Sequence, residues 1–196
     1  SAKIHTTSSL MCWATCDRLA RIAEQLGLRD RYEFWQTHAD DIKAVILKRA
    51  WSPQRQAFVE SFEGKMLDAG VLLMAEVGFI NPHDPRFVST LDVVEKTLGR
   101  GPYMMRYEAP DDFGPPDTAF NICAFWRVTA LARSGRKEEA REIFNALLAS
   151  RNHLGLMSED TKPDTGEAFG NFPQTYSMVG IINAAQLLSL SWDEVI

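Results

Sequence analysis

Seven stretches of this 196-residue chain carry apolar residues at the spacing of an α-helix, and short turns join most of them in pairs. They cover residues 8–26, 30–50, 67–77, 86–98, 119–130, 140–147 and 173–190. The clearest turn runs from Ser134 to Arg136, between an apolar stripe that ends at Ala130 and one that begins at Ala140. Such a pattern predicts consecutive helical hairpins packed side by side, in a single all-α domain over residues 1–196.

The connections between the hairpins are longer and more polar than the turns within them. Three of these connections cover residues 54–65, 106–117 and 157–171. In a series of hairpins every second connection faces the same way, so these three are expected to gather at one end of the array. Functional side chains are disproportionately placed on loops that a rigid scaffold positions. A functional face built from the three loops is therefore predicted.

Composition argues against several classes of function. The net charge is −5 and no run of lysine or arginine forms a basic stripe, so nucleic acid is not expected as a partner. Neither a signal peptide nor an apolar run of membrane-spanning length is evident, so a cytoplasmic protein without a membrane partner is expected. The three cysteines and four histidines lack the spacing of a metal site. We expect no metal and no cofactor, and a neutral or weakly charged ligand.

Glu159 lies in a polar loop whose path is set by backbone-restricted residues, with Gly155 before it and Gly170 and Pro173 at its end. A rigidly held loop carboxylate is a candidate catalytic group. The alternative is that Glu159 and Asp160 only solvate a turn or cap a helix. The residue pattern alone leaves both interpretations open.

Arg106 and Tyr107 would offer a fork of hydrogen-bond donors and a stackable ring to a polyhydroxy ligand. The alternative for Arg106 is an ion pair with Asp111 or Asp112 in the same connection. Tryptophans at helical spacing are usually core residues. Among the five in this chain, only Trp51, at the start of a polar connection, has an independent claim to a site.

Several segments carry a resemblance to a known family. They are LMCWATCDRLARIAE from Leu10, MLDAGVLLM from Met66, GFINPHDPRFVSTLDVVEKTL from Gly78, AFNICAFWRVTALARSGRKEEAREIF from Ala119 and LGLMSEDTKPDTGEAFGNFPQTYSMVGIINAA from Leu154. Together they resemble the C-terminal half of the catalytic domain of glucoamylase-like glycoside hydrolases of family fifteen. That family includes bacterial glucoamylases, glucodextranases and some trehalases.

The resemblance implies an (α/α)6 toroid, a ring of six helical hairpins, of which about seven helices are present here. It also implies hydrolysis of an α-glucosidic bond with inversion, on a small-molecule α-glucoside or oligosaccharide. In that reaction one carboxylic acid protonates the leaving oxygen and a second carboxylate activates water on the opposite face, roughly 6.5 to 9.5 Å away. Trehalose and starch-type oligosaccharides both stay open as substrates.

The resemblance also implies roles for individual residues. Glu159 occupies the position of the general base in the family's Ser-Glu motif. Arg106 matches an arginine that binds sugar hydroxyls, and Tyr176 falls where an aromatic side chain lines the first sugar site. Tyr107 and Asp68 are weaker matches, and Asp68 is equally open to a structural role.

The chain departs from the family pattern in two respects, and the first concerns the general acid. The family's general acid lies in a Trp-Glu motif just upstream of the segment that matches His5 to Cys16, and this chain begins after it. The isolated chain is therefore expected to be inactive. The second concerns Ser8 and Ser9, which stand where the family usually carries lysine, and Asp117 and Thr118, which stand where it often has an acidic residue followed by glycine. One alternative is a truncated, non-catalytic carbohydrate-binding module. Another is self-association, in which exposed hairpins of two copies close a ring as a homo-oligomer.

Overall fold

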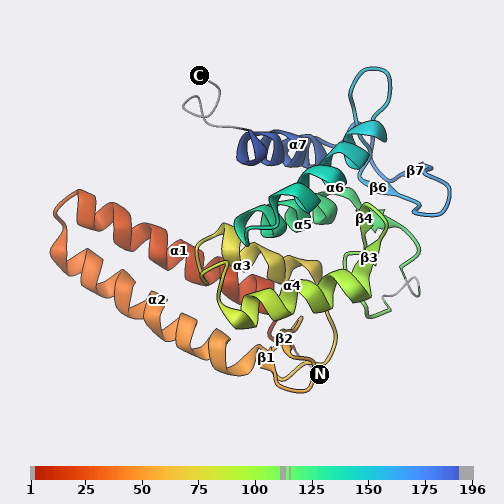
Figure 1. Cartoon of the computed structure of the whole chain (residues 1–196). Coiled ribbons are helices and arrows are strands. Elements are labelled where there is room, and N and C mark those ends of the chain that lie inside the picture. Colours follow the sequence, from red (N-terminus) through yellow and green to blue (C-terminus); the bar gives the residue numbers. More distant parts are fainter. Residues whose placement is uncertain (1–2, 111–113, 115, 190–196) are drawn as a thin grey trace.

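A computed structural model of the chain describes residues 3–110, 114 and 116–189. Helices make up most of this part of the molecule, as Figure 1 shows. The predicted all-α class is thus confirmed. The end of the last predicted helix, Trp192, and the two acids proposed as partners of Arg106, Asp111 and Asp112, lie outside the described residues.

The described residues form seven α-helices and one short 3-10 helix, all of which lie close to the predicted stretches. The helices are α1 (Thr6–Gln25), α2 (Arg29–Arg49), η1 (Ala69–Leu72), α3 (Leu73–Glu76), α4 (Pro85–Leu98), α5 (Asn121–Arg133), α6 (Lys137–Ala149) and α7 (Thr175–Leu188). Short antiparallel strand pairs occupy the long connections. They are β1 (Trp51–Ser52) with β2 (Ala57–Phe58), β3 (Gly99–Arg100) with β4 (Tyr103–Met104), and the three-stranded set β5 (Ala119–Phe120), β6 (Asp160–Thr161) and β7 (Ala168–Phe169).

Helix ends follow local hydrogen bonding more closely than apolar spacing. Asp84 caps α4 by accepting a hydrogen bond from the backbone N–H of Arg86 at 2.9 Å, with Pro85 in the first turn. The Arg86 side chain holds the pKa of the Asp84 carboxyl below its usual range. The last helix begins at Thr175, two residues later than predicted, because the Gln174 side chain accepts from the backbone N–H of Tyr176.

The helices form two layers. Helix α1, the η1–α3 segment, α5 and α7 pack against one another in that order, while α2, α4 and α6 lie outside them and pack on their own hairpin partners or on α5. In Figure 1 the α1–α2 hairpin extends to one side, and α5, α6 and α7 lie together at the other. Eleven of the thirteen residues of α5 are buried, which makes it the centre of the described part.

The packing of α7 on α5 depends on a close approach. Gly180 of α7 lies against the ring of Phe125, where a Cβ atom would come within 2.5 Å of Phe125 Cδ2. Phe125 itself is 2% exposed and meets Phe144 of α6 edge to face, with ring centroids 6.4 Å apart. The absence of a side chain at Gly180 therefore lets α7 dock on the buried helix.

The long connections meet at one end of the helices, as predicted. Arg55 of the β1–β2 connection pairs with Glu108 of the next connection at 3.1 Å. That connection continues into β5, which pairs with β6 in the third, so that Phe120 lies opposite Asp160. The described parts of the three polar loops are therefore linked to one another at this end.

Candidate active site

The backbone around Glu159 is fixed by the buried start of α5. Asn121 is 1% exposed, and its backbone N–H donates to the carbonyl oxygen of Glu159 at 2.9 Å. Its side-chain Nδ2 donates to the carbonyl of Ser158 at 3.0 Å, and its Oδ1 accepts from the hydroxyl of Thr161 at 3.0 Å. The Ser177 hydroxyl donates to the same Ser158 carbonyl at 2.9 Å. This buried, mutually satisfied network holds the short segment that carries Glu159.

The Glu159 carboxylate is bound from one side by Asn171. The backbone N–H and the side-chain Nδ2 of Asn171 both donate to Oε2, at 3.0 and 2.8 Å. No described residue donates to Oε1. Glu159 is partly buried, and one oxygen of its carboxylate is engaged while the other has no donor among the described residues.

Arg106 lies between an acid and an indole ring. Its guanidinium donates to Oδ1 of Asp68, and its Cζ lies 5.4 Å from the ring centroid of Trp126. Asp68 also accepts from the backbone N–H of Gly70, so it caps η1 as well as binding Arg106. Tyr107 lies opposite Asp68 in an isolated antiparallel bridge. Among the described residues, Asp68 therefore binds Arg106 and also begins η1, so it makes structural contacts at this site.

Tyr176 completes an aromatic group on the same face. Its ring lies edge to face with Phe120 at 6.4 Å and with Trp126 at 6.3 Å between centroids. Burial raises the pKa of the Tyr176 hydroxyl, and a side-chain hydrogen bond with Trp126 opposes that effect. The ring is still 46% exposed, so one part of it is open to a ligand.

Asp160, next to Glu159, is a second carboxylate at this end of the molecule. Its Oδ2 accepts a hydrogen bond from the Thr118 hydroxyl at 2.6 Å. Burial raises the pKa of the Asp160 carboxyl, the Thr118 hydrogen bond lowers it, and the charge of Glu159 raises it further. The two neighbouring acids therefore have different environments.

The structure places the four predicted site residues, Glu159, Arg106, Tyr107 and Tyr176, at the loop end. A chain of contacts runs from Arg106 through Trp126 and Tyr176 to Phe120, whose strand pairs with that of Asp160. Trp51 is not part of this group, since its ring packs on Phe58 at 5.3 Å beside the β1–β2 pair.

Sequence reasoning missed three supporting residues: Trp126, Asn121 and Asn171. Trp126 was grouped with the core, and its 8% exposure agrees with that prediction, but its ring also contacts both Arg106 and Tyr176. The sequence does indicate a role for Asn121, because a polar side chain at the start of a strongly apolar helix needs hydrogen-bond partners. The link from Asn171 to Glu159 spans 12 positions and follows from loop folding alone.

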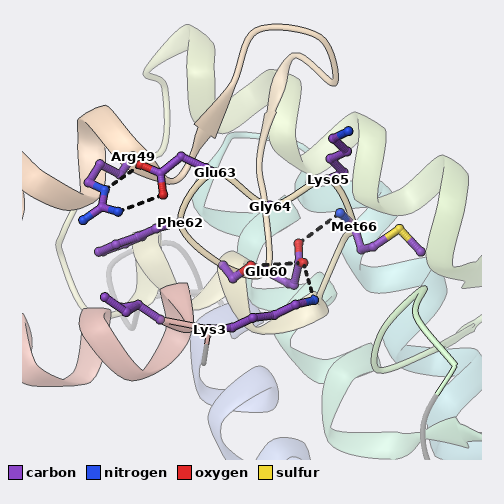
Figure 2. Close-up of a pocket in the computed structure, with 10 residues that line it drawn as sticks. Lys3, Arg49, Glu60, Phe62, Glu63, Gly64, Lys65 and Met66 are labelled. Atoms are coloured by element: carbon purple, nitrogen blue, oxygen red, sulfur yellow. Dashed lines mark hydrogen bonds and ion pairs between the residues drawn. The ribbon is translucent and has the colours of Figure 1, made fainter. Parts of the chain in front are cut away.

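A cavity of about 550 Å³ near the N-terminal segment is lined by other residues, as Figure 2 shows. Arg49 forms a fork with Glu63, at 2.6 and 2.8 Å, and lies over the ring of Phe62. Glu60 accepts from the backbone N–H of Met66 at 3.0 Å and pairs with Lys3. The Glu60–Met66 bond closes the 60–66 loop, and Lys3 and Arg49 attach that loop to the N-terminal segment and to α2. None of the four predicted site residues lines this cavity.

Two general properties of the described residues bear on function. No group of three or more histidine, cysteine, aspartate or glutamate side chains among them has an arrangement that could hold a metal ion. Within the same residues, no helix is both long and apolar enough to cross a membrane.

Comparison with known proteins defines the class. The model of the family "Glycosyl hydrolases family 15" matches residues 2–186. The chain belongs to this family. A trehalase of Thermoplasma volcanium is 33% identical over 187 residues, which are 95% of this chain and 30% of that protein. A trehalase of Mycobacterium tuberculosis is 34% identical over 182 residues, which are 91% of this chain and 27% of that protein.

Solved structures show the same fold at lower identity. A bacterial glucoamylase complexed with acarbose matches 93% of this chain and 33% of its own, with a TM-score of 0.75 and 18% identity. A glycosidase variant in complex with glucose matches 95% of this chain and 52% of its own, with a TM-score of 0.82 and 14% identity. The two layers of hairpins thus have the (α/α)6 arrangement. The chain spans about a third of the length of the trehalases it matches.

Proposed function

We propose that this chain forms the C-terminal half of the catalytic domain of an enzyme that hydrolyses α-glucosidic bonds with inversion, and that Glu159 is its general base. The observation that carries the proposal is the state of the Glu159 carboxylate. Asn171 binds Oε2, and Oε1 has no donor among the described residues. A general base needs an oxygen that can accept a proton from water within hydrogen-bond reach.

The neighbouring side chains suit a sugar ligand. Arg106 keeps its orientation through Asp68, and a guanidinium has five N–H donors, so one ion pair leaves donors for hydroxyl groups. The half-exposed ring of Tyr176 offers an apolar face for a sugar ring. We therefore propose that Arg106, Tyr107 and Tyr176 bind the glucosyl unit to be cleaved. Family membership and the location of all three on the loop end support this assignment.

The reaction needs a second carboxylic acid to protonate the leaving oxygen, and none of the residues above is assigned that role. The family resemblance assigns it to a Trp-Glu motif, and the sequence of this chain contains no Trp-Glu pair. We propose that the acid belongs to the part of the enzyme that the longer relatives have in addition. The names of the trehalases at 33% and 34% identity favour trehalose as substrate over starch-type oligosaccharides.

Hydrolysis assays test this division of labour. The chain alone is expected to release no glucose from trehalose or maltose, whereas a polypeptide of the relatives' length that contains it is expected to turn over at least one of them. Hydrolysis by the chain alone at the rate of the longer polypeptide would show that the general acid lies within these 196 residues and would contradict the proposal.

A second candidate function is a non-catalytic carbohydrate-binding module, which would use the exposed ring of Tyr176 and the guanidinium of Arg106 without cleaving the sugar. Calorimetric titration of the chain with trehalose and maltose addresses it, with Arg106→Ala as the matched variant. Binding without hydrolysis in both the chain and the longer polypeptide, weakened in the variant, would support the module. An absence of binding to the chain would count against it.

Light scattering on the same sample tests the homo-oligomer, since a monodisperse monomer excludes a ring closed by two copies.

A further inference from the structure

Asn171 is tied to Glu159 by three hydrogen bonds. The backbone N–H of Glu159 donates to the carbonyl of Asn171 at 2.9 Å. In return, the backbone N–H and the side-chain Nδ2 of Asn171 donate to Oε2 of Glu159 at 3.0 and 2.8 Å. The backbone and the carboxylate of Glu159 are therefore both held by one residue of the opposite side of the loop.

The residue before Asn171 shows how closely the loop is folded around this acid. Gly170 has a φ of +74°. A Cβ atom there would lie 2.8 Å from Oε2 and 2.9 Å from the Cβ of Glu159. Only glycine combines this backbone conformation with this approach. The close approach of the Gly170 backbone is what brings both donors of Asn171 to one oxygen.

We propose that Asn171 is a positioning residue for the reaction, which selects Oε1 of Glu159 as the oxygen that takes the proton. This inference rests on the proposed function. With Oε2 occupied, water donates one proton to Oε1 while its oxygen forms a bond to the anomeric carbon. The bond from that carbon to the leaving oxygen breaks, and the leaving oxygen takes a proton from the carboxylic general acid of the enzyme.

An amide is chemically suited to this task. An ionised carboxylate only accepts hydrogen bonds, so the Nδ2 side of Asn171 must face Glu159. A neutral donor can bind Oε2 without adding a cation that would compete for the carboxylate. Two donors converging on one oxygen also restrict rotation of the carboxylate about its last bond. The orientation of Oε1 is therefore set before substrate arrives, as precise placement of a reacting group requires.

Nuclear magnetic resonance on the chain itself tests the contact without turnover. The backbone and side-chain amide signals of Asn171 are expected to shift strongly in Glu159→Ala, and the backbone amide is expected to lose its protection against hydrogen exchange. Both signals should stay unchanged in Thr165→Ala, a variant of the same loop whose hydroxyl accepts only from the backbone N–H of Glu167. Asn171 signals that are identical in wild type and Glu159→Ala would overturn the proposal.

Kinetics on the longer polypeptide test the positioning role. Asn171→Ala is expected to lower kcat about 10- to 100-fold with KM changed by less than about twofold, because a misdirected base impairs the chemical step rather than binding. Asn171→Asp keeps the shape but removes the side-chain donor, and is expected to lose at least as much. If both Asn171 variants keep wild-type kcat while Glu159→Gln shows a large loss, the positioning role of Asn171 is overturned and the proposed function is not. Wild-type turnover in Glu159→Gln would instead overturn the proposed function.

Discussion

Replacement of Glu159 by glutamine in the longer polypeptide is expected to lower kcat for trehalose and maltose by about 10²- to 10⁴-fold, the range for loss of a general base. Glutamine keeps the length and shape of the side chain, and its amide oxygen can still accept from Asn171. The amide cannot take a proton from water at neutral pH. The loss should therefore fall on kcat, and initial rates over a range of substrate concentrations measure it.

The matched control for this variant is Glu167→Gln. Glu167 is an exposed acid of the same loop, and no described contact involves its carboxylate. Its replacement removes the same charge and is expected to leave kcat within about twofold of wild type. If Glu159→Gln keeps wild-type turnover while circular dichroism shows an intact fold, Glu159 is not the base.

Truncation of Phe125 to alanine is expected to lower the free energy of unfolding by about 3 to 5 kcal/mol, the range for loss of a buried phenylalanine. The ring is 2% exposed and fills the space between Gly180 of α7 and Phe144 of α6. Without the ring, the space stays empty unless α7 shifts. Since α7 carries Tyr176, sugar binding is expected to weaken together with stability. Urea unfolding at neutral pH measures the change in the free energy of unfolding.

Phe34→Ala is the control for Phe125→Ala, because it removes the same ring from a surface position. Phe34 of α2 is 49% exposed, and its ring lies edge to face with Trp35 and His38. Surface substitutions usually change stability by less than about 0.5 kcal/mol, and loss of the contacts with Trp35 and His38 is expected to add only slightly to that change. Equal losses in the two variants would contradict the central role of α5 in the core.

Apolar spacing was sufficient to predict outer helices such as α4 and α6, because each of them buries a single face. The stripes of 86–98 and 140–147 correspond to α4 and α6. The predicted 67–77 helix is a shorter η1–α3 segment, since Asp68 is in an extended conformation and begins the helical turn only at Ala69. Two-residue strands such as β6 and β7 have too few positions for an alternating pattern, so they could not be predicted.

Apolar spacing could not assemble the site, because its contacts join elements that are far apart in the chain. Arg106 meets Asp68 across 38 positions and Trp126 across an interface between a loop and a helix. Helical spacing assigns Trp126 to the core, and burial agrees, yet its ring also packs edge to face with Tyr176. The residue pattern made Glu159 and Arg106 candidates with a structural alternative each, and only the family resemblance gave them their predicted roles.

The stereochemistry of hydrolysis tests the central proposal most directly. Proton magnetic resonance of the first products of trehalose, recorded before the anomers interconvert, distinguishes attack by water opposite the leaving group from passage through a covalent intermediate. Inversion turns the attacked unit into β-glucose and releases the other unit as α-glucose, so equal amounts of the two anomers are predicted. Release of α-glucose alone would mean retention, and it would contradict the assignment of Glu159 as the base that activates water.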